Sequence, residues 1–550
     1  MAAHIETGTM AHPKLYRSKL IDHLGLVAGM YDELGIGEQI DRLIPQDNDK
    51  RTVSIGQAVK AMVLNGLGFA NRALYLTPLF FQGKPVDRLI GKGIEADHLN
   101  DDVLGRILDA LYAYGLEALY QQVSILAVKR LGLPCHFVHM DSTSFHTDGK
   151  YNSGEEPEDG VIQITQGYSR DHRPDLNQAV LQLICERQAG IPLLMQPLSG
   201  NNSDKVSFRE MIKTHIEQMR TNFGVKYLIA DSALYTAETL KDLAVTWWIS
   251  RVPETLTLAC DLIHAIAPDL MRDLSQKSFC SVCTSYGDVK QRWLVVYSPE
   301  AYQRAQKTVD KQCLKQSRAE LRHFEKLCIQ DFACEADARK ALAAFEKKLK
   351  MTGVADAAIK AWPRFNGKGR PAQGREPDFY VYRIEGALAS IPQERMRRLE
   401  RKSCFILATN QLDDQVLSDE ELLAAYKDQQ KVERGFRFLK DPLFMASSLF
   451  LKSPKRIMAL MMIMTLCLLV YAALEHRIRA ALKANNQVFP DQKGKAITRP
   501  TARWVFQFFG GIHILAINKT QTLVLNLNAH HLSLLKLLGK PYEEIYSGTA

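Results

Sequence analysis

The sequence lacks the features of several large protein classes. It has no internal repeat and no low-complexity tract, which excludes a solenoid and a repetitive disordered chain. The N-terminal stretch MAAHIETGTMAHPKLYRSKL contains no apolar core of the kind that a signal peptide needs. The ten cysteines follow no repeating frame, unlike those of a small disulfide-stabilised secreted protein. We therefore expect a cytoplasmic protein with reduced thiols.

Cysteine motifs that could bind a metal are scarce. Cys280 and Cys283 form a single CxxC, and neither a second CxxC nor a His pair follows at the spacing of a zinc ribbon or finger. We interpret both residues as plain buried thiols rather than as half of a zinc site.

The sequence contains a single long hydrophobic run. Ile457 to Leu474 is an uncharged run of 18 residues, which just reaches the length of a transmembrane helix. The run stands alone and closely follows a polar segment around Glu433. We therefore predict a helix buried in the protein core and no membrane contact.

The composition is that of an average folded soluble protein, with 46% hydrophobic and 24% charged residues in 550. The formal net charge is +9, with a pI near 8.9. Nearly the whole excess lies between residues 451 and 510, where ten basic residues face two acidic ones for a net charge of +8. Such a stretch suits a polyanionic partner. The basic residues are Lys452, Lys455, Arg456, Arg477, Arg479, Lys483, Lys493, Lys495, Arg499 and Arg503.

The residue pattern predicts an α/β protein. Residues 20 to about 133 have helical apolar spacing, typical of either a helix-turn-helix reader of DNA or a plain helical packing domain. After Pro134 the pattern indicates three strands, then a helix, a strand, a helix and a strand, which is the order of a ribonuclease-H-like core. We expect a mixed sheet interrupted by a large β-containing insertion, with an N-terminal all-α domain. The predicted segments are a helical domain that is a candidate for DNA-end binding (1–130), the first part of the core (131–255), an insertion with strands and a charged helix (256–400), the second part of the core (401–480) and a basic C-terminal region (481–550).

Two aspartates follow apolar strands. Asp141 comes after FVHM and Asp231 after YLIA, which predicts two carboxylates at the carboxyl ends of strands that could be neighbours. An acid at such a place is unfavourable unless it faces a cleft or binds a cation, although either residue alone could be a turn or a helix cap. Strand position favours Asp141 over the nearby alternatives Asp148, Asp171, Asp175 and Asp204.

A third acid lies in AYKDQQKVERGFRFLK, where Tyr426, Gln429, Glu433 and Lys440 are expected near one face of a helix. This segment resembles the Y-x2-R-x3-E-x6-K signature of DDE transposases of bacterial insertion sequences. Tyr426, Glu433 and Lys440 match at the full spacing, and Gln429 stands where Arg is usual. The resemblance covers residues 135 to 475 and includes GYSRDHRPDLNQ.

The resemblance implies that Asp141, Asp231 and Glu433 bind two catalytic Mg²⁺ or Mn²⁺ ions. It also implies that Tyr426 and Lys440 contact DNA phosphate. Gln429 cannot form the charged bidentate clamp that Arg gives, and Arg434 and Arg437 are candidates to supply the missing charge. The expected DNA-binding set is Tyr426, Gln429, Arg434, Arg437 and Lys440. The family partners are double-stranded DNA, as terminal inverted repeats and target, and a second copy of the chain on paired ends in the nucleoid.

Two other functions fit the same residues: a ribonuclease-H-like nuclease that hydrolyses DNA without strand transfer, and a DNA-binding protein that has lost catalysis. Trp247 and Trp248 could stack on an extruded base, but we interpret them as core residues. The turn with Lys368 and Arg370, like the basic stretch after residue 475, is a candidate for contact with the DNA backbone.

Overall fold

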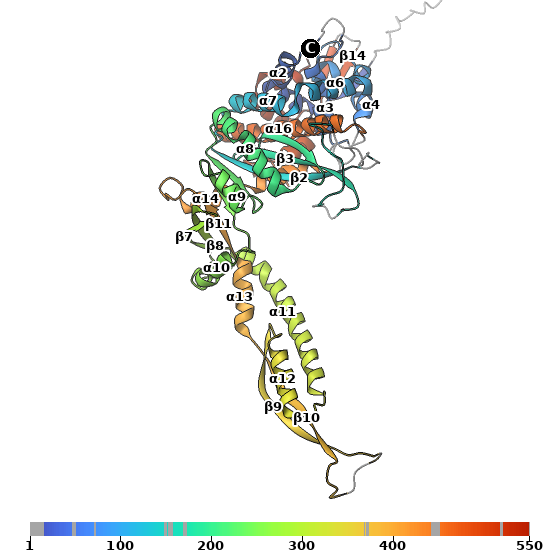
Figure 1. The fold of residues 1–550 in the computed structure, drawn as a ribbon. Coiled ribbons are helices and arrows are strands. Elements are labelled where there is room, and N and C mark those ends of the chain that lie inside the picture. Colours follow the sequence, from blue (N-terminus) through green and yellow to red (C-terminus); the bar gives the residue numbers. More distant parts are fainter. Residues whose placement is uncertain are drawn as a thin grey trace, which may run out of the picture. The chain divides into compact units, whose positions relative to one another are not determined.

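The computed structural model (Figure 1) describes residues 16–46, 51–70, 73–147, 151, 158–168, 173–367, 369, 373–441, 451–517 and 521–548. The chain forms two compact units. The first contains Met1–Ile249 and Glu420–Ala550, and the second contains Ser250–Asp419. The division into five segments that we expected from the sequence stays a prediction. Lys368 and Arg370 lie outside the described residues.

A mixed β-sheet forms the base of the first unit. The sheet has eight strands, and those that begin in this unit occur in the order β4-β3-β2-β5-β6. β2 pairs antiparallel with β3 and parallel with β5, and β3 pairs antiparallel with β4. Two helices connect β4 to β5 and β5 to β6, so the element order is the one that the residue pattern predicts. The elements are β2 (Phe137–Thr147), β3 (Asn177–Glu186), β4 (Pro192–Ser199), α8 (Asp204–Phe223), β5 (Tyr227–Ala230), α9 (Ala237–Asp242) and β6 (Trp247–Arg251).

The uncharged run predicted to be a core helix is part of α16 (Pro454–Ala484). By length and composition α16 is the one described helix that could cross a membrane, but 83% of its most apolar window is buried inside the protein. It packs against helices from the N-terminal part of the chain and against β4. These helices are α1 (Leu24–Glu33), α2 (Ile36–Leu43), α3 (Ile55–Leu67), α4 (Thr77–Phe81), α5 (Val86–Leu89), α6 (Asp101–Tyr114) and α7 (Leu116–Leu131), of which α1, α3, α6 and α7 contact α16.

The C-terminal region packs onto the N-terminal helices. The strand β1 (Tyr16–Leu20), which precedes the helices, pairs antiparallel with β14 (His513–Ile517), and β14 pairs with β15 (Gln521–Leu525). Gly29 of α1 lies so close to the Tyr542 ring that an added Cβ would sit 2.6 Å from it. Both ends of the described chain therefore contribute to one core. The remaining elements are the short pair β12 (Phe489–Pro490) and β13 (Ala496–Ile497), with α17 (Ala502–Phe508), α18 (Ala529–Leu538) and α19 (Lys540–Ile545).

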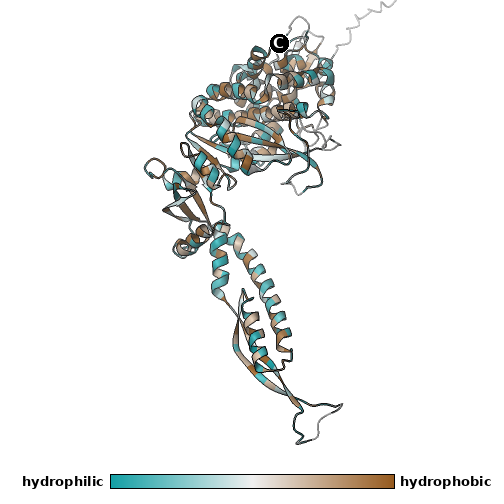
Figure 2. Cartoon of the chain, in the orientation of Figure 1, coloured by the Kyte–Doolittle hydropathy of each residue, from teal (hydrophilic) through white to brown (hydrophobic). Residues whose placement is uncertain are grey.

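The second unit contains further strands and long helices (Figure 1). Along α11, hydrophobic and hydrophilic residues alternate (Figure 2), because only one stripe of the helix, including Ala305, Val309 and Cys313, is buried. The elements are α10 (Thr257–Leu270), β7 (Ser278–Tyr286), β8 (Val289–Tyr297), α11 (Pro299–Cys328), α12 (Glu335–Glu346), the hairpin β9 (Thr352–Arg364) and β10 (Phe379–Ser390), α13 (Pro392–Ser403) and β11 (Cys404–Thr409).

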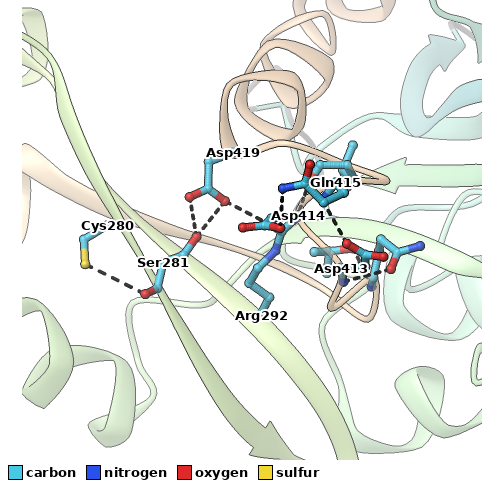
Figure 3. A network of polar contacts seen from close by, with 10 residues as sticks. Cys280, Ser281, Arg292, Asp413, Asp414, Gln415 and Asp419 are labelled. Atoms are coloured by element: carbon cyan, nitrogen blue, oxygen red, sulfur yellow. Dashed lines mark hydrogen bonds and ion pairs between the residues drawn. The ribbon is translucent and has the colours of Figure 1, made fainter.

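Cys280 and Cys283 both lie on β7 and both are exposed, so the expectation of buried thiols was wrong for them. Residues three apart on a strand point to opposite faces, and the two sulfurs therefore cannot converge on one metal ion. The neighbouring Ser281 hydroxyl instead donates to Asp419 at 2.6 Å, and Arg292 lies 3.4 Å from the same carboxylate (Figure 3). This network holds the residue at which α14 (Asp419–Lys427) begins.

Candidate active site

The first two acids are brought together by strand register. β2 and β5 run parallel, and their last paired residues are Met140 and Ala230. Asp141 is the next residue of β2, Asp231 is the first residue after β5, and neighbouring strands lie about 4.8 Å apart. The two carboxylates therefore start from adjacent positions on the sheet. Asp141 does not end its strand as the sequence suggested, because β2 continues to Thr147 in its pairing with β3.

Both carboxylates are half-buried and have a backbone donor. Asp141 accepts a hydrogen bond from the N–H of Ser142 at 2.8 Å, and Asp231 accepts one from the N–H of Ala233 at 2.9 Å. The hydrogen bond between Asp231 and Ala233 belongs to the turn that follows β5. Hard carboxylate oxygens at adjacent strand positions are the ligand type that Mg²⁺ prefers, so the residues present fit a divalent cation.

The helix expected to carry the third acid is two helices. α14 ends at Lys427 and α15 runs Gln430–Leu439. Between them the backbone tightens: the N–H of Gln429 bonds to the carbonyl of Tyr426 at 3.1 Å, and that of Val432 to the carbonyl of Gln429 at 3.0 Å. Such i to i+3 bonds bring residues three apart into line. The N–H of Glu433 also bonds to the carbonyl of Gln429, at 3.3 Å, but the Gln429 side chain is buried like that of Val432, whereas Glu433 is exposed.

The side chain of Gln429 points into the protein and is only 6% exposed. Its amide Nε2 donates to the carbonyl of Met140 at 3.3 Å, and its Oε1 lies 2.7 Å from Nδ1 of His139. Because a carbonyl can only accept, the amide orientation is set by Met140, and His139 must carry its proton on Nδ1. Gln429 thus joins α15 to β2, on the residues that immediately precede Asp141.

A second set of contacts holds the same junction from the turn between β3 and β4. Arg187 pairs with Asp428 at 2.7 Å, and Nζ of Lys431 donates to the Arg187 carbonyl at 2.8 Å. Burial would raise the pKa of Asp428, but the cations Arg187 and Lys431 hold it below its ordinary value. The turn itself is shaped by the buried Glu186, which accepts from the N–H groups of residues 188, 189 and 191.

Glu433 lies one helical turn after Gln429, on the exposed part of α15. His139 and Asp141 share one face of β2 because they are two residues apart, and α15 packs on this strand through Gln429. Within the described ranges, no three acidic, His or Cys side chains are close enough to form a complete metal cage. Mg²⁺ needs only one or two protein carboxylates, since water and substrate phosphates fill the rest of its shell.

The basic and aromatic residues of the motif are spread over the two helices. Tyr426, on α14, and Lys440, at the end of α15, are half-buried, whereas Arg434 and Arg437 are exposed. Trp248 is fully buried in the core, as expected, whereas Trp247 is 38% exposed and stacks on Tyr227 with ring centroids 5.1 Å apart.

Of the alternative aspartates, Asp175 forms an ion pair with Arg173 at 2.8 Å, and Asp204 begins α8. Asp148 and Asp171 lie outside the described residues.

The sequence alone does not connect His139 to Gln429. The two residues are 290 positions apart, and no local pattern joins them. The one available signal was the departure from Arg at position 429, because an amide can both donate and accept in a buried site whereas a guanidinium only donates.

The buried His139 predicts an acid-sensitive step in stability. Burial lowers its pKa from 6.5 to about 4, more than the hydrogen bond to Gln429 raises it. At a pH between these two pKa values, His139 therefore binds a proton in the unfolded chain but not in the folded protein. Stability is unaffected by this group above about pH 6.5 and falls by about 3 kcal/mol as the pH drops to about 4.

We expect His139→Gln to be less acid-sensitive than the parent chain by this amount. Urea unfolding of both full-length proteins, followed by tryptophan fluorescence at several pH values from neutral to acidic, measures the difference. Equal pH dependence of the two proteins would contradict a neutral buried His139.

Comparisons with known proteins identify the family of this chain. A family model described as "Transposase DDE domain" matches residues 137–470, and one described as "Domain of unknown function (DUF4277)" matches residues 16–125. Among solved structures, a piggyBac transposase synaptic complex with hairpin DNA aligns with 96% of this chain and 81% of its own, at 9% identity and a TM-score of 0.35, too low to carry an argument. No curated protein matches the chain. Because the transposase domain covers more than half of the sequence, the chain belongs to the DDE transposase family.

Proposed function

We propose that this protein is an insertion-sequence transposase that cuts DNA at the ends of its element and joins the freed 3′ ends to target DNA. The observation that carries the proposal is that Asp141 and Asp231 directly follow Met140 and Ala230, which are paired on parallel strands within the span of the transposase domain. Both reactions are in-line displacements at phosphorus, and one site can perform them in turn.

In this proposal Asp141, Asp231 and Glu433 hold two Mg²⁺ or Mn²⁺ ions. When bound, the two cations would activate the attacking oxygen and stabilise the leaving oxygen. The half-buried aspartates start from the rigid sheet, whereas Glu433 comes from a helix held to that sheet by Gln429 and Lys431. Because α15 is held in place, the Glu433 carboxylate would lose little conformational freedom when it binds a cation.

Gln429 is given a positioning role in place of the phosphate contact suggested by the family signature. Its buried amide is occupied by Met140 and His139, which supports a link between α15 and β2. Phosphate charge at this site is then met by Lys440 and Arg437 at the end of α15 and by Tyr426 on α14, whereas Arg434 binds phosphate on another face of the same helix. Arg437 and Arg434 are exposed, and no described carboxylate lies within 4.0 Å of either guanidinium group.

The DNA partners in this proposal are the terminal inverted repeats of the element and a target duplex, with two copies of the chain on paired ends. The site of action is the cytoplasmic nucleoid. These assignments follow from the reaction, because each joining event needs two element ends and one target.

A cleavage and strand-transfer assay tests the proposal. The full-length chain is incubated with Mg²⁺ or Mn²⁺ and labelled DNA from the flanks of its gene, and the products are separated on denaturing gels. We expect nicking at the element ends, followed by joining of the 3′ ends to a second duplex.

Cleavage without joining would replace the proposal with a nuclease, and binding without cleavage would replace it with an inactive DNA-binding protein. Inverted repeats bracketing the gene identify the substrate ends to be tested.

A further inference from the structure

A large basic groove lies in the first unit, on the side of α15 away from Glu433. It has a volume of about 1330 Å³, and its walls come from α15, α16, the turn after β3 and the segments on either side of β12 and β13. This volume exceeds the range of roughly 300–1,000 Å³ that is typical of small-molecule pockets. Five of its lining residues are basic and one is acidic: Lys431, Arg434, Arg479, Lys483, Arg499 and Glu475.

Three of these cations lack an acidic partner. Arg479 pairs with Glu475 at 2.7 Å, and Lys431 pairs with Asp428 at 3.2 Å. By contrast, no described carboxylate lies within 4.0 Å of Arg434, Lys483 or Arg499, and all three residues are exposed. The unpaired charge of the groove is therefore about +3 before a ligand binds.

The cations also converge. Burial lowers the pKa of Arg479, and the charges of Arg499 and Arg434 lower it further, against the opposite effect of Glu475. Guanidinium groups from α15, α16 and the segment after β13 therefore lie near enough to repel one another. An anion bound among them would remove this repulsion.

The rest of the basic stretch is largely neutralised within the protein. Lys455 pairs with Glu158, Arg456 with Asp109, and Arg477 with Glu33, at 2.6 to 3.0 Å. Arg503 pairs with Asp441. The basic residues between 451 and 510 that have no described ion pair are mainly exposed. Two of them, Lys483 and Arg499, line the groove.

The geometry of α15 separates the groove from the acids. At 100° per residue, Lys431, Arg434 and Phe438 are turned roughly 100–160° away from Glu433. One helix therefore presents an acid on one face and a basic groove on another.

We propose that this groove binds the sugar-phosphate backbone of DNA, with Arg434, Lys483 and Arg499 each neutralising one phosphate, as a contact surface separate from the acidic site. The inference rests on the proposed function for its choice of DNA as the polyanion. A groove of this size can follow a strand over several phosphates, which a single helix terminus cannot.

The test is the salt dependence of DNA binding by the full-length chain. Fluorescence anisotropy is measured with a labelled mixed-sequence duplex and with one of its single strands, for the parent chain and for the triple variant R434Q/K483Q/R499Q. The control is K129Q/K226Q/K536Q, which removes three exposed lysines that lie outside the groove and have no ion pair with a described carboxylate.

We expect the slope of log K against log salt to become shallower by about 2.7 on duplex DNA, or about 2.1 on the single strand, in the groove variant alone. The DNA form whose slope change reaches its own expected value identifies the strand state that the groove prefers. R499Q by itself should change the slope by about one third as much, and circular dichroism checks that both variants are folded.

A groove variant that keeps the parent slope on both DNA forms overturns the inference, as does an equal change in the control variant. This outcome is distinguishable from failure of the proposed function. If the parent chain cleaves DNA but the groove variant keeps the parent salt slope, only the groove proposal is refuted. If the groove variant changes the slope as expected but the parent chain never cleaves DNA, only the transposase activity is refuted.

Discussion

Replacing Asp141 by cysteine is expected to abolish DNA cleavage in Mg²⁺ and to restore part of it when Mn²⁺ is supplied instead. A thiolate is a soft ligand that Mg²⁺ binds poorly, whereas the transition metal Mn²⁺ accepts it more readily. We expect a loss of about 10³-fold in Mg²⁺, which corresponds to about 4 kcal/mol of transition-state stabilisation. Asp231→Cys should behave in the same way, because Asp141 and Asp231 directly follow the paired residues Met140 and Ala230.

The readout is the initial rate of end cleavage in each metal, with Asp97→Cys as a matched control at an exposed acid outside the site. A change of metal preference cannot be produced by misfolding, so the experiment reports metal contact rather than stability. Full activity of Asp141→Ala in Mg²⁺ would refute the assignment of this residue.

Replacing Gln429 by arginine, the residue usual in the family signature, is expected to destabilise the protein by at least about 3 kcal/mol, because it leaves a buried and unpaired cation. The position is 6% exposed, and its neighbour His139 offers an N–H, so two donors would face each other. The same change at Gln430, which is exposed on the same helix, should alter stability by less than about 0.5 kcal/mol.

A double-variant cycle separates positioning from general instability. His139→Asp combined with Gln429→Arg places a carboxylate opposite the new cation, so part of the lost stability and cleavage should return, with a coupling of about 1–3 kcal/mol. Gln429→Glu supplies a further readout: a carboxylate beside Nδ1 should raise the pKa of His139 from about 4 and shift the acid limb of the cleavage profile. Additive effects in the cycle and an unmoved pH profile together would remove Gln429 from the positioning role.

Much of the site could be predicted because its parts are local patterns. Each aspartate follows a short apolar segment that is recognisable alone, and the parallel pairing of Met140 with Ala230 then makes them neighbours. The prediction of one continuous helix around Glu433 failed at residues 428 and 429. There the backbone forms i to i+3 hydrogen bonds, and the side chains contact β2 and Arg187. Helical periodicity cannot predict these contacts.

The sequence by itself determined the order of strands and helices, the positions of the acids and the burial of the long uncharged helix, because periodicity and apolar content act over a few turns or strands. Only the tertiary structure decided which basic residues stay unpaired and where Gln429 points. Arg456 and Arg499 look alike in the sequence, yet one pairs with Asp109 and the other lines an open groove. Whether a side chain forms such an ion pair depends on residues that are hundreds of positions away in the sequence. Their proximity results from the packing of the whole core and cannot be predicted from the local sequence.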